Sequence, residues 1–250
     1  MLSYARAGSG KGRDWILPNL AHVRDRSLLV VDVKDGENCF ASYRHRSETL
    51  GQPCIYLNPF GLLGLPNTPI NPLQTLTDIV QGGGEIDTQA DEIAQILLPP
   101  GPKDGGNGWV RKGALRLLAT RMEYLAHCEP DQCNLGGLWR FVNASTDDLD
   151  KAFMMMETCG IEGIARRAAA LRATFVDAPK QFEAYKSEAI EALNPFEPGK
   201  TLERTTREHG FDFARLKHEP HTVYLITPSE KLGVIAPWIS LIVNYAIEAI

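Results

Sequence analysis

Three apolar runs in the chain have the length and composition of buried β-strands. They span residues 28–33, Cys54–Leu57 and Thr222–Ile226, and a shorter run at residues 2–5 precedes a glycine-rich segment. Unbroken apolar runs of this kind, without polar alternation, are typical of parallel strands buried on both faces. Helical patterns follow the early runs, at about residues 12–18 and 39–49. The sequence therefore predicts βα units and a parallel sheet with right-handed crossovers.

From about residue 73 to residue 216 the pattern changes, because strand signals nearly vanish and apolar residues recur at helical spacing. Several helix starts are marked by a capping box or by a proline in the first turn: Thr88 with Asp91, Ser145 with Asp148, and Pro179. A break rich in glycine and proline at residues 99–108 precedes a long helix. A further helix is predicted over residues 235–250, with Pro237 in its first turn.

The long helix is predicted to have an apolar and a polar side. The apolar side contains Val110, Ala114, Leu118 and Leu125, and the polar side contains Lys112, Arg116, Thr120 and Glu123. The adjacent residues Met154, Met155 and Met156 are interpreted as core residues, in preference to an adaptable binding surface.

The glycine-rich segment ARAGSGKG at residues 5–12 has the features of a phosphate-binding loop. Its glycines let backbone N–H groups surround phosphate oxygens, and the following helix N-terminus adds positive potential. Against the pattern G-x-x-x-x-G-K-[ST], Ala5 replaces the first glycine and Gly12 replaces the hydroxyl residue. An ordinary turn is the alternative interpretation. The residues predicted to bind phosphate are Gly8, Ser9, Gly10, Lys11 and Gly12.

Asp32 lies near the end of the apolar run 28–33. Open α/β sheets place their ligands at the carboxyl ends of the strands, so this carboxylate could meet a metal ion or water beside a bound triphosphate. An aspartate at a strand end can equally cap the following helix, and the sequence leaves both interpretations open.

The overall composition is mildly acidic, with a net charge of −5 and a pI near 5.7. Such a chain is not a generally basic nucleic-acid coat, so contacts with DNA would have to come from local clusters. The candidates are Arg44-His45-Arg46, Arg111-Lys112 with Arg116, and Arg166-Arg167 with Arg172. Solvated helix faces are the alternative for each cluster.

The cysteines and the apolar stretches bear on the cellular compartment. Five cysteines without framework spacing indicate reduced thiols. His127, Cys128 and Cys133 match no common zinc pattern, so no metal site is predicted. The longest apolar stretch, residues 234–250, contains proline and polar residues and is predicted to be unsuited to a bilayer span. We therefore expect the chain itself to be soluble.

Several motifs, in order along nearly the whole chain, resemble the TraG/TraD-type coupling proteins of type IV secretion and conjugation. The most specific are the glycine-rich loop with the following Ile-Leu-Pro-Asn-Leu, and Asp32-Val33-Lys34 with Gly36-Glu37-Asn38. Weaker matches follow in the same order: Tyr43-Arg44, Leu57-Asn58-Pro59-Phe60, Asn71-Pro72-Leu73, Trp109 with Ala114, and Phe211-Asp212. Asp35 stands as an extra residue inside the usual Asp-x-Lys-Gly-Glu.

The resemblance implies a P-loop RecA-like parallel sheet interrupted by an inserted all-α domain, which is an α/β fold. It implies ATP and Mg²⁺ as cofactors, with Asp32 and Glu37 as catalytic candidates on the metal or water side. The implied partners are single-stranded DNA with a relaxase or protein substrates, and inner-membrane components of the secretion system. The resemblance further implies a homo-hexamer in the complete protein, at the cytoplasmic face of the bacterial inner membrane.

The predicted organisation has three parts. Residues 1–72 form the first part of the nucleotide-binding core, residues 73–216 the all-α insertion, and residues 217–250 the continued core. No apolar strand ending in Asp-Glu occurs in the sequence, although the resemblance implies one on the next strand. We therefore expect a C-terminally truncated motor, and ATP hydrolysis stays open. The alternatives are a non-catalytic recruitment module with a vestigial nucleotide site, and another P-loop DNA translocase.

Overall fold

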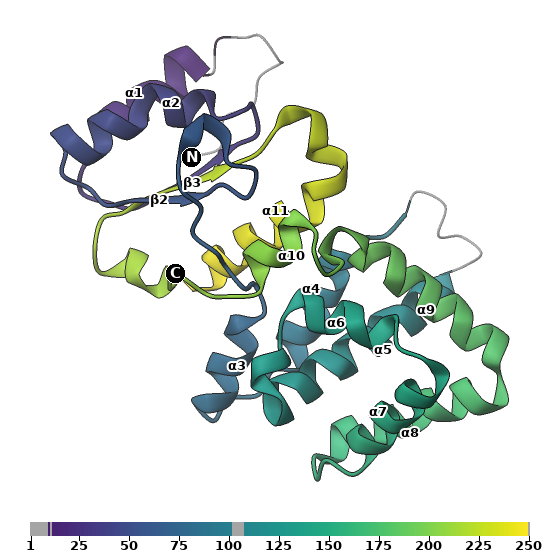
Figure 1. Ribbon diagram of the computed structural model, residues 1–250. Coiled ribbons are helices and arrows are strands. Elements are labelled where there is room, and N and C mark those ends of the chain that lie inside the picture. Colours follow the sequence, from purple (N-terminus) through teal and green to yellow (C-terminus); the bar gives the residue numbers. More distant parts are fainter. Residues whose placement is uncertain (1–9, 11, 102–107, 250) are drawn as a thin grey trace. The chain divides into compact units, whose positions relative to one another are not determined.

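The computed structural model of the chain describes residues 10, 12–101 and 108–249 (Figure 1). The predicted first strand at residues 2–5 lies outside the described residues. By its internal contacts the chain divides into two compact units. One contains residues 1–70, 210–239 and 246–250, and the other contains residues 71–209 and 240–245.

The first unit contains a parallel sheet whose three strands, among the residues that the structure describes, are β1 (Leu28–Asp32), β2 (Cys54–Leu57) and β3 (Thr222–Ile226). The strand order is β1-β3-β2, so the last strand in the sequence is the central one. Both Leu28 and Cys54 pair with Thr222. All residues of β3 are buried, as its unbroken apolar run predicts. The predicted α/β class, the parallel pairing and these three strands are confirmed.

Two helices cover one face of this sheet (Figure 1). They are α1 (Leu17–His22), preceded by a π-helical turn at Gly12–Ile16, and α2 (Glu37–Arg44), followed by a π-helical turn at His45–Thr49. Between helices and sheet lies an apolar core formed by Leu20, Val30, Cys39, Tyr224 and Ile226. Of the prediction that Pro18 ends or kinks the first helix, the ending was wrong, because the helix continues to His22. Pro18 lies in the first turn of α1, directly after the π-helical turn.

Arg46 is fully buried in the first unit. Its guanidinium donates to the carbonyl oxygens of Leu20 at 2.6 Å and Val23 at 3.1 Å, and to the side chains of Thr222 and Gln52. Burial lowers the pKa of the guanidinium. The prediction that residues 44–46 form a basic cluster for DNA is therefore wrong for Arg46. Its side chain joins α1, β3 and the loop before β2, and it is too deeply buried to contact DNA.

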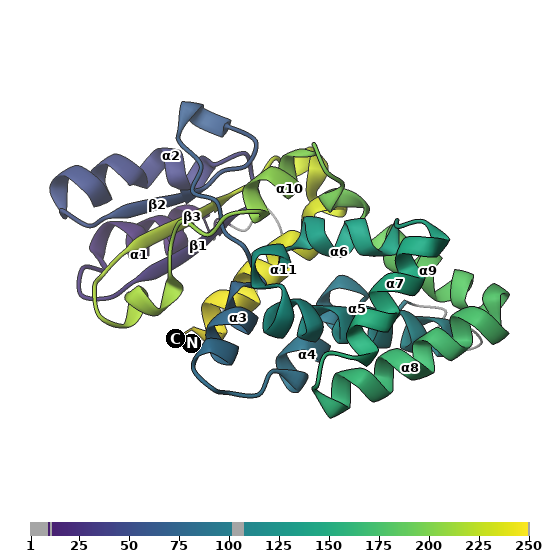
Figure 2. The same ribbon diagram turned by 60° about the horizontal axis from the view of Figure 1, so that its bottom comes forward.

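The second unit is helical throughout its described residues. It contains α3 (Gln74–Gln81), α4 (Asp87–Leu97), α5 (Gly108–Cys128), α6 (Leu135–Val142), α7 (Thr146–Glu157), α8 (Glu162–Asp177), α9 (Pro179–Leu193), α10 (Thr201–Thr206) and residues 240–245 of α11 (Leu232–Glu248). The long helix α5 packs against α3, α4, α8 and α9 (Figure 2). An aromatic cluster of Phe141, Phe153, Phe175 and Phe182 joins α6, α7, α8 and α9.

The predicted helix starts have mixed outcomes. Ser145 caps α7 by accepting the backbone N–H of Asp148 at 3.2 Å, and Pro179 begins α9, so both predictions are confirmed. The capping box of Thr88 with Asp91 was wrong. Helix α4 begins one residue before Thr88, and no side chain caps it.

The two sides predicted for α5 agree with the structure only in part. Ala114, Leu118 and Leu125 are buried, but so are Thr120 and Glu123 on the predicted polar side. The reason is that other helices pack against α5 on more than one side, which leaves little of it in water. The methionine prediction also holds only in part, because Met156 is buried whereas its two neighbours are exposed.

Helix α11 begins earlier than predicted. It starts at Leu232 after a 3₁₀ turn at Ser229–Lys231, so Pro237 lies inside the helix and not in its first turn. The helical stretch Ser229–Glu248 has 20 residues and a mean hydropathy of 1.2, which satisfies the length and composition of a membrane span. By length and composition alone, this disagrees with the prediction that the stretch is unsuited to a bilayer span. Core helices of soluble proteins satisfy the same criteria, so this helix is weak evidence for a span.

Candidate functional site

The carboxyl edge of the sheet in the first unit collects polar side chains. Asp32 is the last residue of β1, Asn58 follows β2 and Thr227 follows β3. All three are buried. Parallel sheets place ligand sites at this edge, because the loops and helix N-termini converge there.

Asp32 is only 1% exposed and lies against the start of α2. One carboxylate oxygen accepts the backbone N–H of Cys39 at 2.8 Å, and the other accepts the side-chain amide of Asn38 at 3.3 Å. Burial raises the pKa of Asp32, and the hydrogen bonds from Cys39, Asn38 and Lys34 oppose that rise. These contacts are those of a helix-capping aspartate. A role on the metal or water side of a nucleotide site stays a prediction.

Cys39 is a buried neighbour of Asp32. Burial raises the pKa of its thiol to about 12, with the Asp32 carboxylate adding to the rise. The thiol therefore stays protonated at neutral pH and is a poor nucleophile. Like the other four cysteines, it is free of disulfides.

The extra residue in the motif, Asp35, forms a turn with Gly36 that links two loops at this edge. Both residues have left-handed backbone angles, with φ of 57° and 86°. The Asp35 carboxylate accepts the backbone N–H of Ser229 at 3.1 Å and its hydroxyl at 2.8 Å. A Cβ added at Gly36 would lie 2.8 Å from Leu63, so glycine is needed there for space as well as for conformation. The Asp35 insertion thus ties the loop after β1 to the loop after β3.

Thr227 was missed by the sequence analysis. It is fully buried, and its backbone N–H donates to the carbonyl oxygen of Asp32 at 3.1 Å. Its hydroxyl has no hydrogen-bond partner among the described residues. Its place directly after an apolar strand was the available signal. A carboxylate oxygen is a ligand that Mg²⁺ accepts in proteins, but Asp32 is in register with Ile226, so Thr227, one residue further, points to the opposite face of the sheet.

The phosphate loop falls largely outside the part of the chain that the structure describes, since Gly8, Ser9 and Lys11 are not among the described residues. Gly10 has a φ of 83°, and a Cβ added there would lie 2.8 Å from a carboxylate oxygen of Asp14. Gly12 begins the π-helical turn. A left-handed glycine before a helical turn fits a loop that directs backbone N–H groups at phosphate. Glu37, the first residue of α2, is exposed.

The predicted basic clusters in the second unit separate into partnered and unpartnered side chains. The partnered ones are Arg111 with the carbonyl of Leu98, Arg166 with Glu162, Arg167 with Glu123, and Arg172 with Asp150 and Glu157. Lys112 and Arg116 are exposed and have no carboxylate within 4.0 Å in the described ranges. The structure therefore brings together only part of the predicted basic surface.

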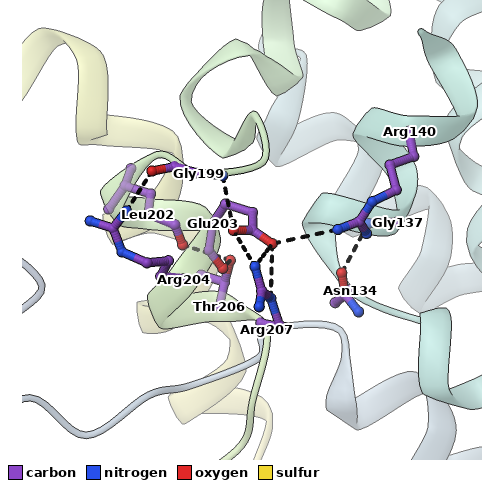
Figure 3. Close-up of polar contacts among 9 residues, drawn as sticks. All are labelled: Asn134, Gly137, Arg140, Gly199, Leu202, Glu203, Arg204, Thr206 and Arg207. Carbon is purple, nitrogen blue, oxygen red and sulfur yellow. Dashed lines mark hydrogen bonds and ion pairs between the residues drawn. The ribbon is translucent and has the colours of Figure 1, made fainter.

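A buried carboxylate in the second unit was also missed by the sequence analysis (Figure 3). Glu203 of α10 is 1% exposed and accepts two hydrogen bonds from Nη2 of Arg207, both at 2.8 Å. Arg140 of α6 approaches the same carboxylate at 3.8 Å. The carboxyl group lies against Gly136, where an added Cβ would lie 3.1 Å from it. This network fastens α10 to α6.

Comparison with known proteins gives one family. A family model described as "Type IV secretory system Conjugative DNA transfer" matches residues 1–250. No curated protein matches the chain.

Proposed function

Since the chain belongs to the type IV secretory system conjugative DNA transfer family, we propose that it is the ATP-binding part of a coupling protein. Such a protein recruits DNA or protein substrates and drives them into the secretion channel. The observation that carries this proposal is the family match along the whole sequence. The parallel sheet of the first unit, with its polar carboxyl edge, supports it, because this is the architecture on which nucleotide sites are built.

In the proposed nucleotide site, Gly8, Ser9, Gly10, Lys11 and Gly12 hold the phosphates of ATP. Asp32 and Glu37 are the candidates on the metal or water side, and the exposed Glu37 lies at the start of the helix that Asp32 caps. Mg²⁺, when bound, neutralises charge that develops on the phosphates during transfer. The left-handed Gly10 supports the assignment of the phosphate loop.

The second unit corresponds in this proposal to an all-α domain, predicted over residues 73–216, inserted into a P-loop RecA-like core. Binding functions often reside on elements added to a rigid α/β frame. We assign to this unit the contacts with single-stranded DNA, its relaxase or protein substrates. The complete protein would act as a hexamer with inner-membrane components, at the cytoplasmic face of that membrane.

The test is the binding of ATP, or of a non-hydrolysable analogue, to the 250-residue chain with and without Mg²⁺. Lys11→Ala should weaken binding, because the lysine supplies the point charge on the phosphates. Lys180→Ala is the matched control, since Lys180 is exposed and lies in the first turn of another helix. Equal affinities of wild type and Lys11→Ala would remove the phosphate assignment.

Two other functions give different results in the same experiments. A recruitment module with a vestigial site would bind relaxase-linked DNA or protein substrates and no nucleotide. Another P-loop DNA translocase would bind nucleotide and DNA without recognising secretion substrates.

A further inference from the structure

A pocket of about 350 Å³ lies within the second unit, between α4, α5 and α8. Its polar lining consists of Asp91 and Gln95 from α4, Lys112, Arg116 and Thr120 from α5, and Arg167 from α8. This volume lies in the range of small-molecule sites. None of these residues belongs to the proposed nucleotide site.

The α5 and α8 walls of the pocket are rich in cationic donors. Lys112 and Arg116 are four residues apart on α5, so they point to the same side of the helix, and neither forms a salt bridge with any described residue. Arg167 is paired with Glu123 through Nη2, but its buried Nε has no partner within the described part of the chain. Because Glu123 pairs with Arg167, the positive charge left without a carboxylate partner at the pocket, among the described residues, is that of Lys112 and Arg116, and a bound anion would pair with it.

Thr120 is an independent sign of a ligand. It is only 1% exposed, it lines the pocket one turn beyond Arg116, and its hydroxyl has no hydrogen-bond partner in the described residues. A threonine inside a helix usually bonds the carbonyl oxygen four residues earlier. An unpartnered buried hydroxyl costs folding free energy, and a ligand oxygen in the pocket would satisfy it.

The α4 wall has the opposite character. Asp91 offers a carboxylate and Gln95 an amide. The negative charge is felt locally, since Asp91 and Asp87 both raise the pKa of Glu123, in addition to its burial, while Arg167 lowers it. A simple anion would be repelled by this wall, whereas a ligand with hydroxyl groups could donate hydrogen bonds to it.

We propose that this pocket binds a small phosphate monoester that carries hydroxyl groups, of the class of sugar phosphates and nucleoside monophosphates. The phosphate contacts Lys112, Arg116 and Arg167 and accepts from the Thr120 hydroxyl. The hydroxyl groups of the ligand donate to Asp91 and Gln95. A nucleic-acid strand lying on the surface would reach Lys112 and Arg116 but not the buried Thr120.

The proposal is tested by titrating ribose 5-phosphate into the 250-residue chain in a calorimeter. Thr120→Val has nearly the same shape and should weaken binding about 2- to 10-fold, the value of one hydrogen bond. Its unfolding midpoint should stay unchanged or rise, because no hydrogen bond of the free protein is lost. The double variant Lys112→Gln with Arg116→Gln should weaken binding by about 100-fold or more. Arg166→Gln, on the same helix as Arg167 but outside the pocket, should bind as wild type.

Further arms of the titration separate the sources of phosphate. Ribose 5-phosphate should bind at least tenfold more tightly than inorganic phosphate, and equal affinities would overturn the role of the α4 wall and with it the proposal. The absence of saturable binding, or a loss of binding in Lys11→Ala, would also overturn it. The proposal would also be overturned if single-stranded DNA bound through Lys112 and Arg116 and Thr120→Val changed the affinity of neither the DNA nor ribose 5-phosphate. Lys11→Ala that loses ATP but keeps ribose 5-phosphate would support two separate sites.

Discussion

The buried guanidinium of Arg46 is the feature of the first unit whose loss should be most damaging. Arg46 donates to four acceptors: the carbonyls of Leu20 and Val23 and the side chains of Thr222 and Gln52. These acceptors belong to α1, the segment after it, the central strand and the loop before β2. Arg46→Met keeps much of the apolar volume of the side chain but removes every donor. The carbonyls of Leu20 and Val23 then lose this donor, whereas the side chains of Thr222 and Gln52 keep the 3.3 Å hydrogen bond between them.

The magnitude follows from the burial of those acceptors. Each buried polar group left without a hydrogen bond costs about 1–3 kcal/mol. Part of that cost is offset, because the variant no longer has to bury a charge. With two carbonyls losing their donor, we therefore expect Arg46→Met to lower the free energy of unfolding of the first unit by about 2–4 kcal/mol.

The assay is urea unfolding followed by hydrogen exchange at the backbone amides of β3, which reports on the first unit separately from the second. Arg44→Met is the matched control, because Arg44 is exposed and lies two residues away, and it should leave exchange unchanged. A loss below about 1 kcal/mol for Arg46→Met would refute the reasoning, since the acceptors would then have found water or other partners.

Three further predictions concern local packing, capping and pH. Gly113→Ala should destabilise the second unit by about 1–3 kcal/mol, because the added Cβ would overlap the ring of Tyr185 on α9. Gly163→Ala in α8 should instead stabilise by up to about 1 kcal/mol, because only Arg167 comes within 4 Å of the added Cβ. Thermal unfolding of both variants checks this difference. Ser145→Ala should lower the free energy of unfolding by about 1 kcal/mol, because α7 loses its cap. The control Ser187→Ala, at an exposed position inside a helix, should not destabilise the protein. Equal effects of the two variants in urea unfolding would contradict the capping role. Burial raises the pKa of Asp32, so its contribution to stability is present at low pH and is lost as pH rises through the folded-state pKa. Asp32→Asn should therefore flatten the pH dependence of the free energy of unfolding. An unchanged pH dependence would argue against a raised pKa of Asp32 in the folded protein.

The local parts of the fold could be predicted from the sequence, and the long-range contacts could not. The runs Cys54–Leu57 and Thr222–Ile226 are strands with the predicted bounds, because an unbroken apolar run records burial on both faces. Ser145 caps its helix because its partner lies only three residues away. The partners of Arg46 and Asp35 lie far along the chain, as Thr222 and Ser229 show. Nothing in a local pattern marks such pairs.

The candidate site divides in the same way. The position of Asp32 at the carboxyl end of a strand was predictable, but its hydrogen bonds to α2 were not. Thr227 directly follows β3 and was missed because a threonine after a strand is not a distinctive chemical signal. Thr120 and Glu123 were misplaced because the burial of α5 depends on neighbouring helices.

The strand order β1-β3-β2 also has a consequence for synthesis on the ribosome. Strands β1 and β2 have no hydrogen bonds to each other in this sheet, since β3 lies between them. About 160 residues separate β2 from β3, and translation at 5–20 residues per second needs roughly 10–30 s to make them. During that interval the early strands lack their partner, while residues 71–209 emerge as a nearly continuous folding unit. The nascent chain should therefore acquire its helical unit first and complete its parallel sheet last.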